Sequence, residues 1–325
     1  MKLGILDQVP MPNGSDPSQV LKQTVELAQF AEKLGYERYW LAEHHNTNGL
    51  LSAAPEILMT RIASATDHIR VGSGGILLPQ YSPLKVAETF KTMESLFPGR
   101  VDLGVGRSPG GTERTRAALT DGRESMLSEF PRHLDELNGF MRNELPKNHP
   151  YRMVKVTPRG GESPPIWLLG LSPRSGRLAA ERGIGLTFGH FINPDKWEST
   201  LRTYRENFKP GVLPEPAVTV CVFVVCAETQ EEAEKLALSQ DRWLLSIEKG
   251  DSQLHDPDSI KLPSDQLDQI RHNRRRTLIG TPEKIRDGLM ELSRRYETDD
   301  FLLITNIYSH EAKKRSYELI AEAFR

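Results

Sequence analysis

Short apolar segments alternate with longer amphipathic segments along most of this chain. Short apolar runs bounded by turn residues predict buried strands, whereas apolar residues that recur every three or four positions predict helices. The pattern predicts eight strands, at residues 2–8, 39–42, 69–78, 101–105, 166–170, 185–189, 218–225 and 299–305. It predicts helices at residues 18–34, 55–66, 83–96, 123–144, 173–182, 194–207, 231–247, 282–296 and 311–324.

The regular alternation of strand and helix points to one fold class. It predicts an α/β protein, a single (β/α)8 barrel of the TIM type that occupies residues 1–325 as one domain. A doubly wound open sheet is the alternative, because the pattern does not show whether the sheet closes. In both folds the carboxyl ends of the parallel strands gather at one edge, where ligands bind.

Three segments interrupt the alternation. Residues 107–120 are predicted to form a long polar loop, and residues 146–165, which contain proline and glycine, an irregular connection. Residues 248–280 are polar and charged, so we expect an insertion before the last strand with short helical pieces at most. Its run Arg274–Arg276 is either an anion clamp over the barrel mouth or a solvated charged turn.

Charge and composition exclude several classes of partner. The 42 Lys and Arg residues nearly balance the 44 Asp and Glu residues, so no nucleic acid or membrane surface is expected as a partner. The longest apolar run, residues 217–227, is too short to span a bilayer, and the N-terminus turns polar before a signal-peptide core forms. We therefore expect a soluble cytoplasmic protein, in which Cys221 and Cys226 remain reduced thiols.

The second predicted strand ends in three groups that can carry chemistry. The apolar run 39–42 stops at Glu43, His44 and His45. Adjacent residues of a regular strand point to opposite faces, which argues against a metal site built from both histidines. No HExxH motif or cysteine cluster is present either, so no metal is predicted. The histidines are either hydrogen-bonded structural groups or catalytic groups, and their place at a strand terminus favours catalysis.

Two further strand ends offer features for a ligand. Gly74 and Gly75 end the third strand, where a glycine pair indicates a bulge, a plain turn or a flat ligand close to the backbone. Arg107 follows the fourth strand and could bind a phosphate through two parallel hydrogen bonds, although a surface arginine after a turn looks the same.

The segment LLGLSPRSGRLAAERG, residues 168–183, is the more specific indication of an anion site. A strand ends at Gly170, Ser172 can cap the next helix, Pro173 suits its first position, and Ser175 lies in its first turn. Hydroxyls, free backbone N–H groups and the positive end of the helix dipole converge there, as at many phosphate sites. Ordinary helix capping explains the same residues equally well.

With these residues in view, the chain resembles the bacterial luciferase-like flavin monooxygenases. That family also includes alkanal monooxygenases and deazaflavin-dependent oxidoreductases. The resemblance extends over essentially the whole chain. It rests on WLAEHHN, VGSGGILLPQYSPLKVAE, FPGRVDLGVGR, the segment 168–183 and DDFLLITNIYSHEAKKRSYELIAEAF.

The resemblance implies a TIM barrel that holds reduced FMN at the carboxyl ends of its strands. His44 then matches a histidine that assists the flavin chemistry, and His45 is its neighbour. Gly74 and Gly75 match a bulged, often cis peptide on which the flavin ring rests. The implied phosphate contacts are Arg107, Ser172, Ser175 and the backbone of Leu171.

The implied reaction transfers one oxygen atom of O2 to a small organic substrate, with reduced flavin delivered by a separate flavin reductase. Gly106 stands where luciferases carry a reactive cysteine, so light emission does not follow. A deazaflavin (F420)-dependent hydride-transfer enzyme is an alternative, in which Arg274–Arg276 would contact the longer cofactor tail. A flavin-binding protein without turnover is another. The resemblance also implies a homodimer that pairs through the helices beside the second and third strands.

Overall fold

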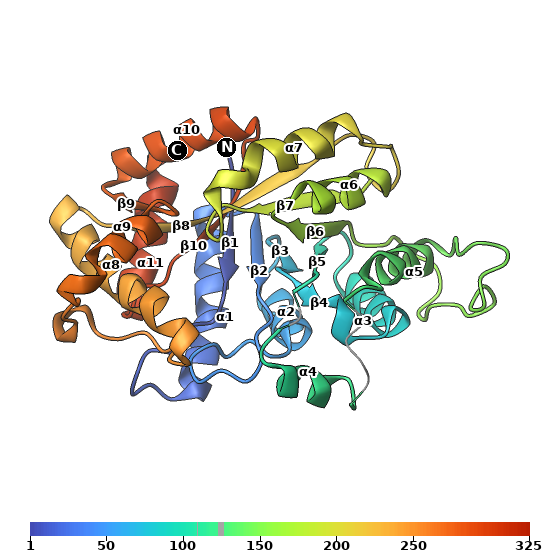
Figure 1. Ribbon diagram of the computed structural model, residues 1–325, viewed down its shortest axis with the longest axis horizontal. Coiled ribbons are helices and arrows are strands. Elements are labelled where there is room, and N and C mark those ends of the chain that lie inside the picture. The colour runs from blue at the N-terminus through green and yellow to red at the C-terminus, as the bar shows by residue number, and fades with distance from the viewer. Residues whose placement is uncertain (109, 123–126) are drawn as a thin grey trace.

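The chain folds into a closed parallel barrel surrounded by helices (Figure 1). The computed structural model describes residues 1–108, 110–122 and 127–325. Strands β8 and β10 pair with each other and close the barrel, which excludes the open sheet. The barrel strands, in order around the wall, are β1 (Lys2–Asp7), β2 (Arg38–Leu41), β3 (Arg70–Ser73), β5 (Val101–Gly106), β6 (Ile166–Gly170), β7 (Gly185–Gly189), β8 (Val218–Cys226) and β10 (Asp300–Ile304).

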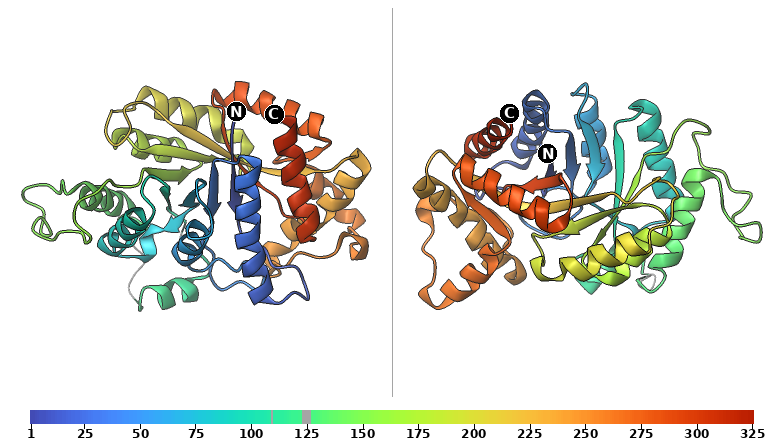
Figure 2. Two further views of the ribbon diagram at one scale, coloured as in Figure 1. Left: turned by 180° about the vertical axis from the view of Figure 1, so that it is seen from behind. Right: turned by 90° about the horizontal axis from the view of Figure 1, so that it is seen from above.

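Helices follow the strands and lie around the outside of the barrel, as the view from above in Figure 2 shows. Several begin at a capping side chain: that of Asp16, for example, accepts the N–H of Gln19 at the start of α1. The helices are α1 (Pro17–Leu34), α2 (Pro55–Ala63), α3 (Pro83–Leu96), α5 (Phe130–Arg142), α6 (Pro173–Glu181), α7 (Trp197–Glu206), α8 (Gln230–Ser246), α10 (Pro282–Tyr296) and α11 (His310–Ala323). None of the described helices is long and apolar enough to cross a membrane.

The predicted loop 107–120 contains a helix that the sequence pattern did not indicate. This helix, α4 (Glu113–Leu119), starts at Thr112, whose hydroxyl accepts the N–H of Thr115. None of its residues is buried, so it has no apolar stripe from which a helix is predicted. The helix predicted at 123–144 is shorter than expected, and its first residues, 123–126, lie outside the described part of the chain.

The predicted third strand is divided in two. Strand β3 pairs with β2 and β5, and β4 (Ile76–Leu77) pairs with the end of β5. The peptide bond between Gly74 and Gly75 is cis, as the resemblance implied. The backbones approach closely beside this break: a Cβ on Gly104 would lie 2.0 Å from the carbonyl oxygen of Ser73. Glycine is therefore required there.

The insertion 248–280 is more ordered than expected. It contains α9 (Leu267–Arg274) and a strand, β9 (Thr277–Gly280), that pairs with the end of β8. The expectation of helical pieces at most was wrong, because four residues between charged segments give too weak a strand signal. The segment before α9 runs along the barrel mouth: the N–H of Leu254 donates to the carbonyl of Met11, and the Trp243 indole donates to that of Ser252.

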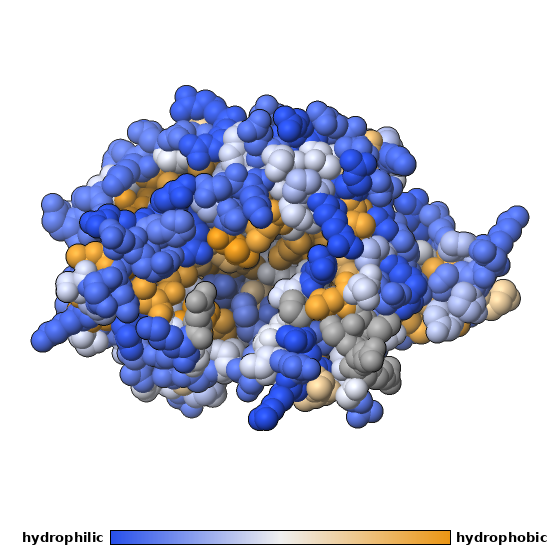
Figure 3. Space-filling view, viewed as in Figure 1, coloured by the Kyte–Doolittle hydropathy of each residue, from blue (hydrophilic) through white to orange (hydrophobic). Residues whose placement is uncertain are grey.

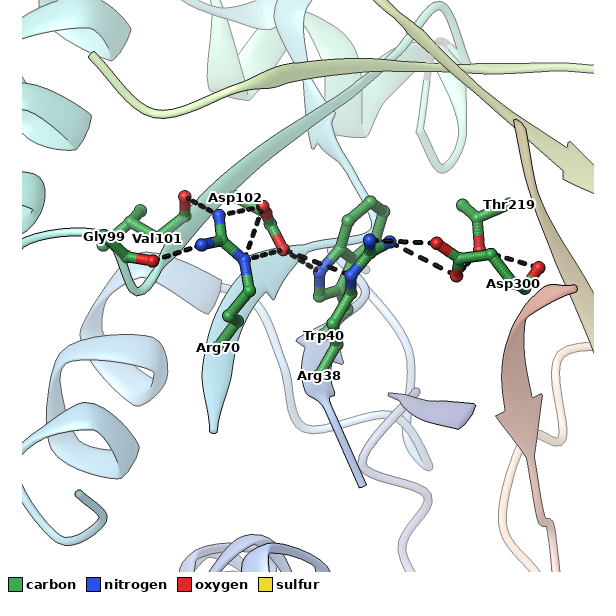
Figure 4. A network of polar contacts seen from close by, with 8 residues as sticks. All are labelled: Arg38, Trp40, Arg70, Gly99, Val101, Asp102, Thr219 and Asp300. Atoms are coloured by element: carbon green, nitrogen blue, oxygen red, sulfur yellow. Dashed lines mark hydrogen bonds and ion pairs between the residues drawn. The ribbon is translucent and has the colours of Figure 1, made fainter. Parts of the chain in front are cut away.

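The amino-terminal end of the barrel interior is filled by a charged network (Figure 4). The indole of Trp40 donates to Asp102 Oδ2 at 3.0 Å, and Arg70 donates to both oxygens of the same carboxylate. Beside it, Arg38 pairs with Asp300 at 2.9 Å. Asp102 is almost fully buried, so its charge is stabilised by these partners rather than by water. This network fills the base of the barrel, and the carboxyl ends remain for a ligand.

Candidate active site

A cavity of about 650 Å³ opens at the carboxyl ends of the strands. The face shown in Figure 3 is hollowed near its middle, where apolar residues gather within a hydrophilic surround. The structure brings all of the site residues predicted from the sequence to this one cavity: His44, His45, Gly74, Gly75, Arg107, Leu171, Ser172 and Ser175. The placement agrees with the prediction, while the role of each residue stays a proposal.

Glu43 anchors the histidine-bearing turn. Its buried carboxylate accepts the N–H of Leu77 at 2.8 Å and the hydroxyl of Tyr81 at 2.5 Å, and it lies 2.7 Å from Nε2 of His45. Three segments therefore meet at one carboxylate: the turn after β2, strand β4 and the loop that leads from β4 to α3. The sequence marked Glu43 only as part of a cluster with the histidines. Its other two partners, Leu77 and Tyr81, lie more than thirty positions away.

His44 lines the cavity with a largely buried imidazole. Strand β2 ends at Leu41, so the strict alternation of side chains no longer applies and both histidines line the same cavity. The argument from strand alternation therefore does not apply to these two residues. Nδ1 of His44 is buried and has no hydrogen-bond partner among the described residues. Burial, with the neighbouring His45, lowers the pKa of His44 to about 4, so its imidazole is neutral near pH 7.

The described histidine, cysteine and carboxylate side chains form no metal-binding cluster. Among the described residues, no group of three or more His, Cys, Asp or Glu side chains is arranged to hold a metal ion. His45 contacts Glu43, and the two residues alone do not complete a coordination sphere. The thiols of Cys221 and Cys226 are both free and buried, as expected for reduced cysteines.

The start of α6 forms another part of the cavity wall. Ser172 and Ser175 cap the helix reciprocally: the N–H of Ser172 donates to Ser175 Oγ at 3.1 Å, and Ser172 Oγ accepts the N–H of Ser175. A Cβ on Gly170 would lie 2.2 Å from Ser175 Oγ, so this cap requires glycine. The capping interpretation is confirmed. The positive end of the helix dipole still faces the cavity, where it favours an anion.

Two arginines stand at this part of the cavity without a protein partner. Arg107 follows β5, and Arg174 lies in the first turn of α6. Both side chains are exposed, and neither has a hydrogen bond or ion pair with any of the described residues. A cation is unfavourable at the N-terminus of a helix unless an anion binds beside it. Arg174 was missed in the sequence, although its first-turn position beside Ser172 was the available indication.

The remaining wall of the cavity is largely apolar and includes one orphaned hydroxyl. Leu6, Leu168 and Phe191 contribute apolar surface, and the backbone of Gly74 and Gly75 lies between the histidines and the arginines along the barrel order. Thr187 Oγ1 is a buried oxygen without a partner among the described residues, and its side chain lines the cavity.

The arginine run of the insertion does not form a clamp over this cavity. Arg274 donates to the buried carboxylate of Asp241 and pairs with Glu234, and Arg275 pairs with Asp195. None of the three arginines of the run lines the cavity. Arg274 is not a solvated turn residue either, because its ion pair with Asp241 is largely buried.

Fold and cavity together are those of an α/β-barrel enzyme. The chain belongs to the luciferase-like monooxygenase family, whose model matches residues 1–298. It is 51% identical over 327 residues to the uncharacterized protein YceB of Bacillus subtilis (strain 168), with 99% of each chain covered. It is 34% identical to the N-acetyl-S-alkylcysteine monooxygenase of the same strain, covering 99% of this chain and 98% of that one.

Solved structures share the same fold. The crystal structure of apo-MsnO8 is 37% identical and superposes with a TM-score of 0.90, covering 99% of this chain and 98% of that chain. The oxygenating constituent of 3,6-diketocamphane monooxygenase from Pseudomonas putida was solved with FMN. It superposes with a TM-score of 0.73 at 20% identity, covering 99% of this chain and 97% of that chain. An F420-dependent secondary alcohol dehydrogenase superposes with a TM-score of 0.69 at 16% identity, covering 100% of this chain and 99% of that chain. The last two show a likeness of fold alone.

Proposed function

We propose that this protein is a monooxygenase that uses reduced FMN and O2 to oxygenate a small organic substrate. One observation carries the proposal: a single cavity is lined by His44, which is neutral near pH 7, and by Arg107 and Arg174, which lack a partner among the described residues and lie beside the start of α6. β2 and β6 are separated by β3 and β5, so the two regions are roughly 14 Å apart along the barrel wall. A planar ring joined to a phosphate by a short chain suits that span.

The arginines and the start of α6 are assigned to the phosphate of FMN. Arg107 and Arg174 supply charge, and the first turn of α6 supplies N–H groups and the helix dipole. Ser172 and Ser175 hold that first turn in place, and their hydroxyl oxygens retain lone pairs beside the cavity. Leu171 contributes backbone at the same point. An anion at this position relieves the unfavourable contact between Arg174 and the helix dipole.

The histidines and glycines are assigned to the ring and the reacting groups. Bound reduced FMN supplies the electrons with which O2 is reduced. A Cβ on Gly74 would meet Leu6, and one on Gly75 would meet the backbone of Gly104, so both positions require glycine. Both residues line the cavity, and the flat ring is assigned to lie against them. His44, neutral near pH 7, is assigned to hydrogen-bond the reacting groups through its imidazole, and His45 is held beside it by Glu43. The apolar walls limit the access of water to the reaction.

The same proposal includes a partner protein and an assembly. A separate flavin reductase delivers the reduced FMN, and the enzyme acts in the cytoplasm as a homodimer. The exposed apolar side chains of Ile57 on α2 and Leu96 at the end of α3 support the dimer. The side chain of Ile57 is 67% exposed and that of Leu96 is 60% exposed, and the two helices follow the second and third barrel strands. Burial of such side chains favours association.

Anaerobic titration tests the cofactor. We expect reduced FMN to bind with a dissociation constant in the micromolar range and reduced F420 to bind much more weakly. His44→Gln should retain FMN binding, which separates cofactor binding from reaction. Tighter binding of F420 than of FMN, or no binding of FMN, would overturn the proposal.

Isotope incorporation tests the reaction. The protein is combined with FMN, a flavin reductase, NADH and ¹⁸O2, and N-acetyl-S-alkylcysteines are offered first because a relative with 34% identity is named for them. We expect a product that carries one ¹⁸O atom in wild-type protein and much less of it in His44→Gln. A protein that binds reduced FMN and reduces the substrate without uptake of ¹⁸O would be a hydride-transfer enzyme instead.

A further inference from the structure

A second cavity, of about 580 Å³, adjoins the first. Three parts of the chain form it: residues 192–195 after β7, the end of α8 with Lys249, and residues 266–276 of the insertion. Ile192 and Ile247 line both cavities, so they form the boundary between them. A ligand that passes these two side chains can occupy both spaces.

The second cavity carries an excess of positive charge. Lys249, Arg275 and Arg276 line it, against the single carboxylate of Asp195 among its lining residues. Arg275 already pairs with Asp195. Lys249 and the imidazole of His272 have no hydrogen bond or ion pair with any described side chain. Among the described side chains, none compensates the charge of Lys249 in the wall of this cavity.

The boundary between the two cavities is apolar. Ile192 is 50% exposed and lines both cavities. Ile247 is half-buried on the other side, and Leu244 and Leu245 continue the apolar surface into the second cavity. An apolar neck followed by a cationic chamber fits a molecule with an apolar stem and an anionic group.

We propose that the second cavity binds the anionic group, a carboxylate or phosphate, of the organic substrate. The apolar part of the substrate then passes between Ile192 and Ile247 and reaches the first cavity, where the reaction takes place. Lys249 is the specificity residue for the anion. The inference rests on the proposed function only in placing the reaction in the first cavity. It also gives a place to Arg275 and Arg276, two residues of the arginine run 274–276, which line the second cavity and not the first.

Binding of a matched pair of probes tests this proposal. Octanoate and octan-1-ol share an alkyl chain and differ in charge, and calorimetry on the flavin-free protein measures both. We expect octanoate to bind at least tenfold more tightly than octan-1-ol. Lys249→Ala should lower the octanoate affinity about five- to tenfold and leave octan-1-ol within twofold. Lys261→Ala, an exposed lysine of the same insertion outside both cavities, is the matched control and should change neither.

Other outcomes would place the anion elsewhere. Equal affinity for the two probes, or an equal loss in Lys249→Ala and Lys261→Ala, would overturn the proposal. An octanoate affinity that falls in Arg107→Ala but not in Lys249→Ala would place the carboxylate in the first cavity. Weaker F420 binding in Lys249→Ala with unchanged octanoate binding would assign the second cavity to a cofactor tail. Because the titration uses no flavin, failure to bind FMN would contradict the proposed function without affecting this result.

Discussion

Glu43 Oε1 lies 2.7 Å from Nε2 of His45, so a buried carboxylate fixes one of the two cavity histidines. The same carboxylate holds Leu77 and Tyr81, which come from the other side of the glycine pair. Glu43 thereby ties the turn after β2 to the segment that follows Gly74 and Gly75. One side chain thus contributes to holding both His45 and the segment after the glycine pair.

Replacement of that carboxylate tests this dependence. Glu43→Gln places an amide NH2 where donors now converge, so one buried group loses its partner. We expect the free energy of unfolding to fall by about 1–3 kcal/mol in urea titrations. Tyr81→Phe removes only one of the contacts and should cost less. A Glu43→Gln protein as stable as wild type would show that the network does not hold this turn.

The stability contributed by neutral His44 should depend on pH. Its folded-state pKa is about 4, below the ordinary value of about 6.5, so the unfolded chain binds the proton more readily. The contribution is complete above about pH 6.5 and is lost as the pH falls toward 4. We expect wild type to lose about 2 kcal/mol more than His44→Asn between pH 7 and pH 5. Parallel pH profiles for the two proteins would contradict the lowered pKa of His44.

The charged network at the base of the barrel should contribute much of the stability. Asp102→Ala leaves the indole N–H of Trp40 and the guanidinium of Arg70 without their buried partner. We expect a loss of about 3–5 kcal/mol, measured by chemical denaturation. Asp258→Ala, which removes an exposed carboxylate paired with Lys235, is the control and should leave stability nearly unchanged. Similar losses in both variants would mean that Asp102 contributes no more than a surface charge.

The barrel and the place of its cavity could be predicted from the sequence because both depend on local signals. Apolar runs such as residues 218–226 are buried throughout and bounded by turn residues, so strand identity follows from composition. Functional groups at the ends of such strands meet because parallel strands place their carboxyl ends together. That rule alone grouped His44, Gly74, Arg107 and Ser172, which are scattered over more than a hundred positions.

The features that were missed depend on contacts between distant residues. Helix α4 buries no residue, and β9 is a four-residue strand that forms by pairing with β8. Glu43 acts through partners from another strand, and Arg174 gains significance only once α6 is seen to point at the cavity. The second cavity joins residues from 192 to 276, and no local pattern indicates such a meeting.

The account depends most directly on the phosphate site at the start of α6. Arg107→Ala and Arg174→Ala each remove one charged contact, which costs about 1.5–3 kcal/mol, or roughly ten- to a hundredfold in affinity for reduced FMN. Riboflavin lacks the phosphate, so its affinity should change by less than about twofold. Arg177→Ala, an exposed arginine on the same helix outside the cavity, is the control. Equal losses for FMN and riboflavin, or no loss for either, would contradict the assignment of this cavity to FMN.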